Sequence, residues 1–95
     1  MEKIILKKGS GKTTRLIEKS SQSGDYIVCH SVEEANRVKR EAMQMGLNIP
    51  LPITYDDFFQ RRYYDRGISG FLIDNLEMFL QSHSIVPINA VTMEP

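Results

Sequence analysis

Short apolar runs alternate with segments of helical periodicity along this chain. Four runs predict strands: KIIL (residues 3–6), YIVCH (26–30), GFLID (70–74) and INAVTM (88–93). None alternates cleanly between apolar and polar residues, which is typical of strands covered on both faces. The alternation of strands and helices predicts an α/β fold with a mainly parallel, four-stranded sheet.

Two helices are indicated by apolar residues spaced three and four apart. The first covers TTRLIEKSSQSG (residues 13–24), with Gly24 as its stop. The second begins with the capping box Ser31 and Glu34 and ends at Gly46. The inward positions are Leu16, Ile17 and Ser20 in the first helix and Val32, Ala35, Val38, Ala42 and Met45 in the second.

Two further helices are expected in the second half of the chain. After a brief extended segment, PIT, a helix from about Asp56 places Phe58, Phe59 and Tyr63 inward. A last helix follows GFLID directly. Its predicted inward face consists of Leu76, Phe79, Leu80 and His83.

The segment GSGKTT (residues 9–14) lies between the first predicted strand and the first predicted helix. Glycines let a backbone approach phosphate oxygens closely, and a helix N-terminus favours anions. In this motif Lys12 would reach the β- and γ-phosphates, and the Thr13 hydroxyl would hold Mg²⁺. The pattern predicts nucleotide binding. The alternative is a flexible Gly/Ser turn before a helix that Thr13 caps.

Leu6 occupies the position of the first glycine of the pattern G-x-x-x-x-G-K-[ST]. A leucine costs about 1–2 kcal/mol if that position needs a positive φ, and little if it is the last residue of a strand. Residues 8–13, which form the phosphate cradle, are intact. We therefore expect the turn before the loop to be narrower and the phosphate-binding site to be retained.

A carboxylate follows the third apolar run. Asp74 comes directly after Phe71, Leu72 and Ile73, at the carboxyl end of a predicted strand, where open α/β sheets bind ligands. Phosphoryl chemistry needs such a carboxylate for the metal. The alternative is that Asp74 caps the next helix.

GSGKTT, FLID and the order of the surrounding elements resemble the first half of P-loop NTPase cores of the helicase- and terminase-like type. They also resemble small P-loop proteins of phages and prophages of Gram-positive bacteria. The resemblance implies a three-layer, Rossmann-like domain that binds ATP and Mg²⁺. It implies that phosphate is contacted by Gly9, Ser10, Gly11, Lys12, Thr13 and Thr14, and Mg²⁺ by Thr13 and Asp74. It further implies that residues 88–93 form a strand that senses the γ-phosphate. This strand would lie between the strand before the loop (residues 3–6) and the strand that ends at Asp74 (residues 70–74). With the strands numbered along the chain, the order is 2-3-4-1.

One departure from that family bears on hydrolysis. Asn75 stands where the family has a glutamate that polarises the attacking water. An amide orients water but cannot accept its proton, so we expect a weak or partner-dependent ATPase. Glu77 is the nearest substitute, with Lys12 and Asp74 as the other catalytic residues. The alternative for Glu77 is a first-turn residue favoured by the helix dipole.

The chain has 95 residues, enough for one domain, and twelve Lys and Arg balance twelve Asp and Glu. No global field draws it to nucleic acid or membranes. RRYYDR (residues 61–66) either stacks on single-stranded nucleic acid or supplies an arginine in trans, or else it is a solvated helix face. One cysteine, Cys29, and no signal peptide or membrane span predict a cytoplasmic protein, in the host if phage-encoded.

Two functions fit these observations. The first is a Mg-ATP-binding P-loop protein in phage DNA metabolism or packaging. The second is a binding module on the P-loop scaffold, for example a phage-encoded inhibitor of a host enzyme, which Leu6, Asn75 and the missing second half of the core suggest. Without that half, residues 3–6 would be a free sheet edge that pairs with a partner protein or a second copy.

Overall fold

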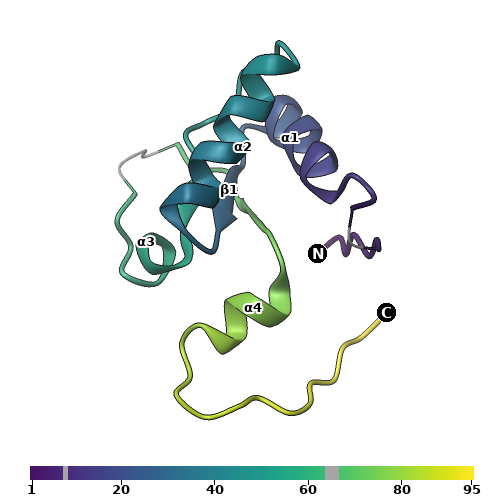
Figure 1. The fold of residues 1–95 in the computed structure, drawn as a ribbon, viewed down its shortest axis with the longest axis vertical. Helices are drawn as coiled ribbons and strands as arrows, with labels where there is room; N and C mark the ends of the chain where they lie inside the picture. The colour runs from purple at the N-terminus through teal and green to yellow at the C-terminus, as the bar shows by residue number, and fades with distance from the viewer. Residues whose placement is uncertain (8, 64–66) are drawn as a thin grey trace.

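A small parallel sheet forms the centre of the computed structural model, which describes residues 1–7, 9–63 and 67–95 (Figure 1). Its three strands are β1 (Tyr26–Cys29), β2 (Ile53–Thr54) and β3 (Phe71–Ile73), in the order β2-β1-β3. β1 is the middle strand and pairs in parallel with both neighbours. The α/β class and the parallel pairing of YIVCH with GFLID are therefore confirmed.

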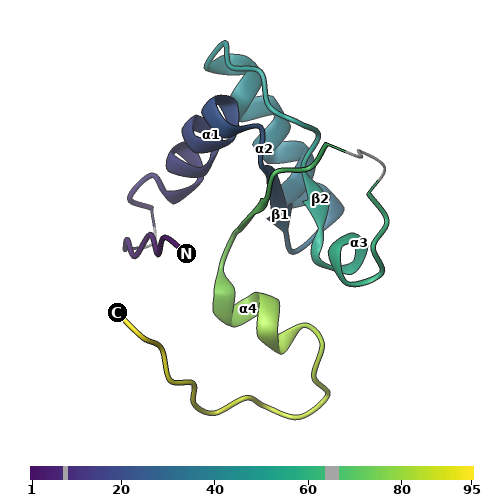
Figure 2. The ribbon, with the colours of Figure 1, turned by 180° about the vertical axis from the view of Figure 1, so that it is seen from behind.

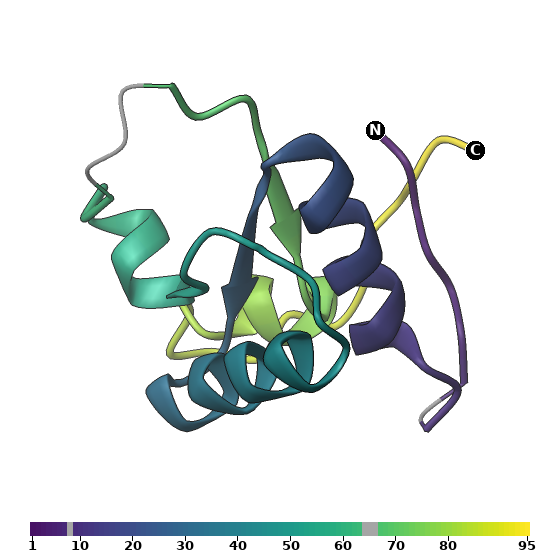
Figure 3. The same ribbon diagram turned by 90° about the horizontal axis from the view of Figure 1, so that it is seen from above.

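The described residues form four helices: α1 (Lys12–Ser23), α2 (Val32–Gln44), α3 (Tyr55–Phe59) and α4 (Leu76–Gln81). α1 and α2 pack against each other and against β1, whereas α3 packs beside β1 and β2. Figure 2 shows β2 leading directly into α3, and Figure 3 shows β1 and β3 side by side. None of the described helices is long and apolar enough to span a bilayer.

β1 is buried on both faces. Its residues Ile27, Val28 and Cys29 are all fully buried, and neighbouring residues of a strand point to opposite faces. Ile27 and Cys29 join the core that α1 and α2 complete. The lack of alternation in YIVCH follows from this double coverage.

Both predicted long helices form as the periodicity indicated. Leu16, Ile17 and Ser20 are the buried residues of α1, and Gly24 ends it at φ 78°. Ser31 caps α2 by accepting a hydrogen bond from the Glu34 N–H at 3.1 Å. Ala35, Val38 and Ala42 are buried, and Gly46 has the expected positive φ of 71°. Val32 was predicted inward, but it is 65% exposed.

An aromatic cluster connects α3 with α4. The ring of Phe79 lies 4.7 Å from that of Phe59 and 5.1 Å from that of Tyr55, centroid to centroid. Phe58 and His83 also contact rings of this cluster. The inward positions predicted for Phe58, Phe59, Phe79 and His83 therefore face one another, although α4 itself has no buried residue.

The predicted strands at residues 3–6 and 88–93 do not form, so the four-stranded sheet and its order 2-3-4-1 are wrong. In that order, residues 88–93 would pair with β3 and residues 3–6 with residues 88–93, so residues 3–6 could join the sheet only if residues 88–93 did. Parallel pairing needs a crossover that packs back onto the sheet. α4 buries none of its residues, and the chain beyond it runs along the side of α4 that lies away from the sheet (Figure 1). The edge strands are β2 and β3.

Two isoleucines test this assignment. Ile17 is fully buried, whereas Ile5, in the segment predicted as the loop strand, is 85% exposed. We expect Ile17→Ala to lower the free energy of unfolding by about 2–5 kcal/mol, because it leaves a cavity in the core. Ile5→Ala should change it by less than about 0.5 kcal/mol. Urea-induced unfolding measures both, and an equal loss in the two variants would show that Ile5 is buried in the core.

Candidate functional site

The segment GSGKTT forms a tight turn that leads into α1. Gly9 and Gly11 have φ values of 81° and 82°, a region that residues with a side chain rarely adopt. The turn closes where the Ser10 N–H donates to the Lys7 carbonyl oxygen at 3.0 Å. Gly11 is the N-cap of α1, and no side chain among the described residues caps this end. Thr13 lies inside the helix, so its alternative role as the cap is wrong.

This turn borders a cavity of about 410 Å³. Ligand pockets for small molecules have volumes of roughly 300–1,000 Å³. Its walls come from the start of α1, the end of β1, one face of α2 and the end of β3. The lining residues are Gly9, Gly11, Lys12, Thr13, Thr14, His30, Glu34, Arg37, Glu41, Asp74, Asn75 and Met78.

Asp74 lies at the carboxyl end of β3, as predicted. Its N–H donates to the Val28 carbonyl oxygen at 3.0 Å, which extends the ladder between β1 and β3 by one residue. Burial, and then the negative charge of Glu34, raise the pKa of Asp74, while Lys12 and Arg37 oppose the shift. The Asp74 carboxylate is therefore held at some electrostatic cost in a cavity that Lys12 also lines.

Asn75, not Asp74, caps α4. Its Oδ1 accepts a hydrogen bond from the Met78 N–H at 3.2 Å, and its φ is 62°. The Tyr55 hydroxyl donates to the carbonyl oxygens of both Asp74 and Asn75. The alternative that Asp74 serves as a helix cap is therefore wrong. The side-chain amide of Asn75 stabilises the start of α4 instead.

Glu77 lies in the first turn of α4 and is exposed. It is not among the residues that line the cavity, so the structure does not bring it together with Lys12 and Asp74. Residues 88–93 do not line the cavity either. Within the described residues, no group of three or more His, Cys, Asp or Glu side chains is placed to hold a metal ion.

The polar face of α2 contributes residues to the cavity that sequence reasoning missed. Glu34, Arg37 and Glu41 are spaced by three and four, so they share one side of the helix. Arg37 pairs with both glutamates, and its hydrogen bond lowers the pKa of Glu34. Thr14 Oγ1 donates to Glu41 Oε1 at 3.1 Å. The sequence signal that could have indicated these three residues is their spacing on a helix that begins just after β1, at the carboxyl end of the sheet.

Parts of two predicted elements lie outside the described residues: Lys8 of the phosphate cradle, and residues 64–66 of RRYYDR. Within the described part of RRYYDR, Arg62 forms ion pairs with Asp56 and Asp57. Neither Arg61 nor Arg62 lines the cavity.

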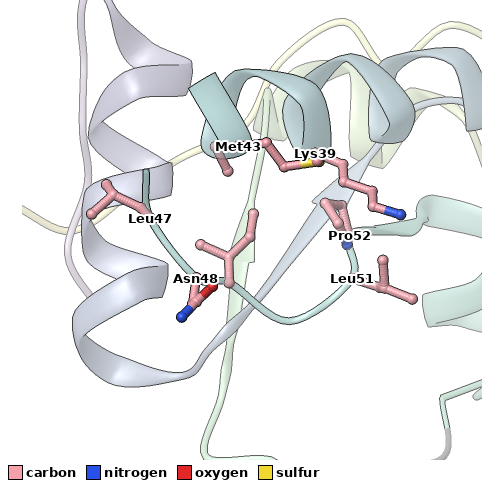
Figure 4. Close-up of a pocket in the computed structure, with 8 residues that line it drawn as sticks. Lys39, Met43, Leu47, Asn48, Leu51 and Pro52 are labelled. Atoms are coloured by element: carbon pink, nitrogen blue, oxygen red, sulfur yellow. The ribbon is translucent and has the colours of Figure 1, made fainter. Parts of the chain in front are cut away.

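A smaller hollow of about 110 Å³ lies at the other end of α2 (Figure 4). Lys39 and Met43 of α2 border it, together with Leu47, Leu51 and Pro52 from the segment that leads to β2. Among the described residues that line it, none is acidic and none belongs to residues 9–14. The larger cavity is therefore the candidate site.

Searches against models of protein families, curated proteins and solved structures found no match to this chain.

Asn75 provides a test of the local geometry. Asn75→Ala removes the side-chain cap of α4, which costs about 1 kcal/mol. It also places alanine, which lacks the polar side chain that makes a positive φ tolerable for asparagine, in a left-handed conformation that costs about 1–2 kcal/mol. Asn75→Gly should cost only a few tenths of a kcal/mol. Urea-induced unfolding compares them, with Asn36→Ala on the exposed side of α2 as control. Equal losses for alanine and glycine would contradict the left-handed conformation.

Proposed function

We propose that this protein binds a nucleoside triphosphate together with Mg²⁺ in the cavity between residues 9–14 and Asp74. One observation carries the proposal: a glycine turn at the start of a helix and a carboxylate at the end of a parallel strand, far apart in the sequence, border the same cavity. This pairing supports the resemblance to P-loop NTPases, of which the domain would be a reduced form.

The residues of the cavity suit a polyphosphate. The uncapped N-terminus of α1 leaves backbone N–H groups for an anion, and Lys12 adds a full positive charge there. Gly9 and Gly11 keep the turn free of side chains at its left-handed positions. The phosphate group would therefore be bound by backbone donors and Lys12.

The charges of the cavity support a divalent cation as a co-ligand. Glu34, Glu41 and Asp74 supply three carboxylates, whereas the basic side chains are those of Lys12 and Arg37. A polyphosphate adds further negative charge, which this set cannot balance alone. Mg²⁺ prefers oxygen ligands and keeps several waters, so the Thr13 hydroxyl and the Asp74 carboxylate are suitable partners. When bound, Mg²⁺ would neutralise charge on the phosphate oxygens.

Binding is better supported than turnover. Asn75 cannot accept a proton and is engaged as a cap, and Glu77 lies outside the cavity lining. We therefore propose a weak or partner-dependent ATPase. ATP as the nucleotide, and a role in phage DNA metabolism or packaging, rest on the family resemblance alone.

A protein-docking function is the second candidate. Beyond α4 the chain exposes a series of apolar side chains, and exposed apolar residues close together often mark interaction sites. These are Ile85, Val86, Ile88, Val91 and Met93. Their exposure favours a module that acts by binding another protein, such as an inhibitor of a host enzyme.

Nucleotide binding is tested by substitution of Lys12. A ligand at a hundredfold excess over its Kd stabilises the fold by about 2.7 kcal/mol, which raises Tm by roughly 10–20 °C in a domain of this size. We expect this shift with Mg-ATP in the wild-type protein and in Lys39→Ala, which alters an exposed lysine outside the cavity. Lys12→Ala should lose it. No shift in the wild-type protein at millimolar Mg-ATP would refute the proposal.

Asp74→Asn should separate stability from binding. Because the pKa of Asp74 is raised in the folded state, its contribution to stability is full below its ordinary pKa and is lost as the pH rises through the raised value. The variant should therefore be more stable than the wild-type protein at pH 7, with a smaller difference at pH 4. It should also lose the Mg²⁺-dependent part of the shift with ATP.

Urea-induced unfolding at both pH values measures the effect of Asp74→Asn on stability. Asp56→Asn, at an exposed aspartate away from the cavity, is the control. A variant that is less stable at pH 7 would show that the Asp74 carboxylate makes a favourable contact in the free protein.

A further inference from the structure

Arg37 links α2 to the first turn of α1. Its Nη2 donates to Thr13 Oγ1 at 3.3 Å, although the two residues lie 24 positions apart. Both side chains line the cavity that holds Lys12 and Asp74. Arg37 thus brings a guanidinium from a different helix to the first turn of α1.

Glu34 and Glu41 hold this guanidinium in place. The Arg37 Nε lies 3.1 Å from both carboxylate oxygens of Glu34, and Nη1 lies 3.5 Å from Glu41 Oε2. The Arg37 side chain remains 48% exposed, and those of Glu34 and Glu41 are 18% and 29% exposed. Ion pairs this accessible to water are worth little, typically less than about 1 kcal/mol. An incoming anion can therefore compete for the guanidinium.

Arginine suits such an exchange of partners. Its planar group presents five N–H donors and matches phosphate oxygens in bidentate geometry. In a phosphate loop the hydroxyl at the position of Thr13 serves the Mg²⁺ ion, and the preceding lysine reaches the β- and γ-phosphates. A guanidinium that already contacts Thr13 Oγ1 consequently lies near the terminal phosphates rather than the base.

We propose that Arg37 recognises the terminal phosphate of a bound nucleoside triphosphate and so makes the site select triphosphate over diphosphate. This inference rests on the proposed nucleotide binding. In the free protein Arg37 donates a hydrogen bond to the Thr13 hydroxyl and forms an ion pair with Glu34. On triphosphate binding, the guanidinium would exchange Thr13 for phosphate oxygens, which would leave the Thr13 hydroxyl available to hold Mg²⁺.

A purely structural role for Arg37 makes a different prediction. If the residue only joined α1 to α2, its loss would lower stability and weaken the binding of every nucleotide by a similar factor. Recognition of the terminal phosphate instead changes the ratio of ATP affinity to ADP affinity. That ratio is a binding property and needs no hydrolysis.

Isothermal titration with Mg-ATP and Mg-ADP tests the proposal. We expect Arg37→Gln to weaken ATP binding tenfold or more and ADP binding less than about threefold. Arg37→Lys keeps the charge but loses the fork, so its ATP-to-ADP ratio should fall between those of the wild-type protein and Arg37→Gln. Arg40→Gln is the matched control, because Arg40 is exposed on α2 and does not line the cavity.

The outcomes separate the two proposals. If the wild-type protein and Arg40→Gln bind neither nucleotide, nucleotide binding itself fails and the role of Arg37 fails with it. If both bind, an unchanged ATP-to-ADP ratio in Arg37→Gln overturns only the role of Arg37. Tighter ATP binding by Arg37→Gln also overturns it, because the guanidinium would then be a competitor for the site. Should Arg37→Gln not fold, the ratio measured for Arg37→Lys decides.

Discussion

The burial of β1 on both faces is the constraint on which the rest of this structure depends. Ile27 and Cys29 fill the core under α1 and α2, while Val28 is buried on the other side and anchors the backbone of Asp74. Ser31, two residues after β1 ends, starts α2 with a side-chain cap. β1 thus determines the position of Asp74, the position of α2, which carries Arg37, and one wall of the cavity.

The cavity combines groups with opposing electrostatic demands. Burial and the charge of Glu34 work against the Asp74 carboxylate, and Arg37 relieves part of that repulsion by pairing with Glu34. Groups that destabilise a fold are commonly found at functional sites, since their arrangement serves a ligand rather than the free protein. The charged residues of α2 that line the cavity contact α1 through two threonines: Arg37 donates to Thr13, and Thr14 donates to Glu41.

The sequence predicted those features that depend on local patterns. The caps of α2, the end of α1 at Gly24 and the position of Asp74 after β3 all follow from a few neighbouring residues. The strands at residues 3–6 and 88–93 were mispredicted because a short apolar run states only that a segment suits burial, not that a partner strand reaches it. Arg37 was not predicted for a related reason: the spacing of Glu34, Arg37 and Glu41 shows that they share one face of a helix, but not whether that face borders a cavity or water.

The position of Cys29 has a consequence for the chemistry of the whole protein. It lies fully buried in the middle strand, and burial, followed by the charges of Asp74 and Glu34, raises the pKa of its thiol to about 12. Oxidants and alkylating reagents act on the thiolate and need access to the sulfur. In the folded protein both conditions fail together, so this cysteine is redox-silent while the sheet is closed and becomes a nucleophile only in molecules whose sheet has opened.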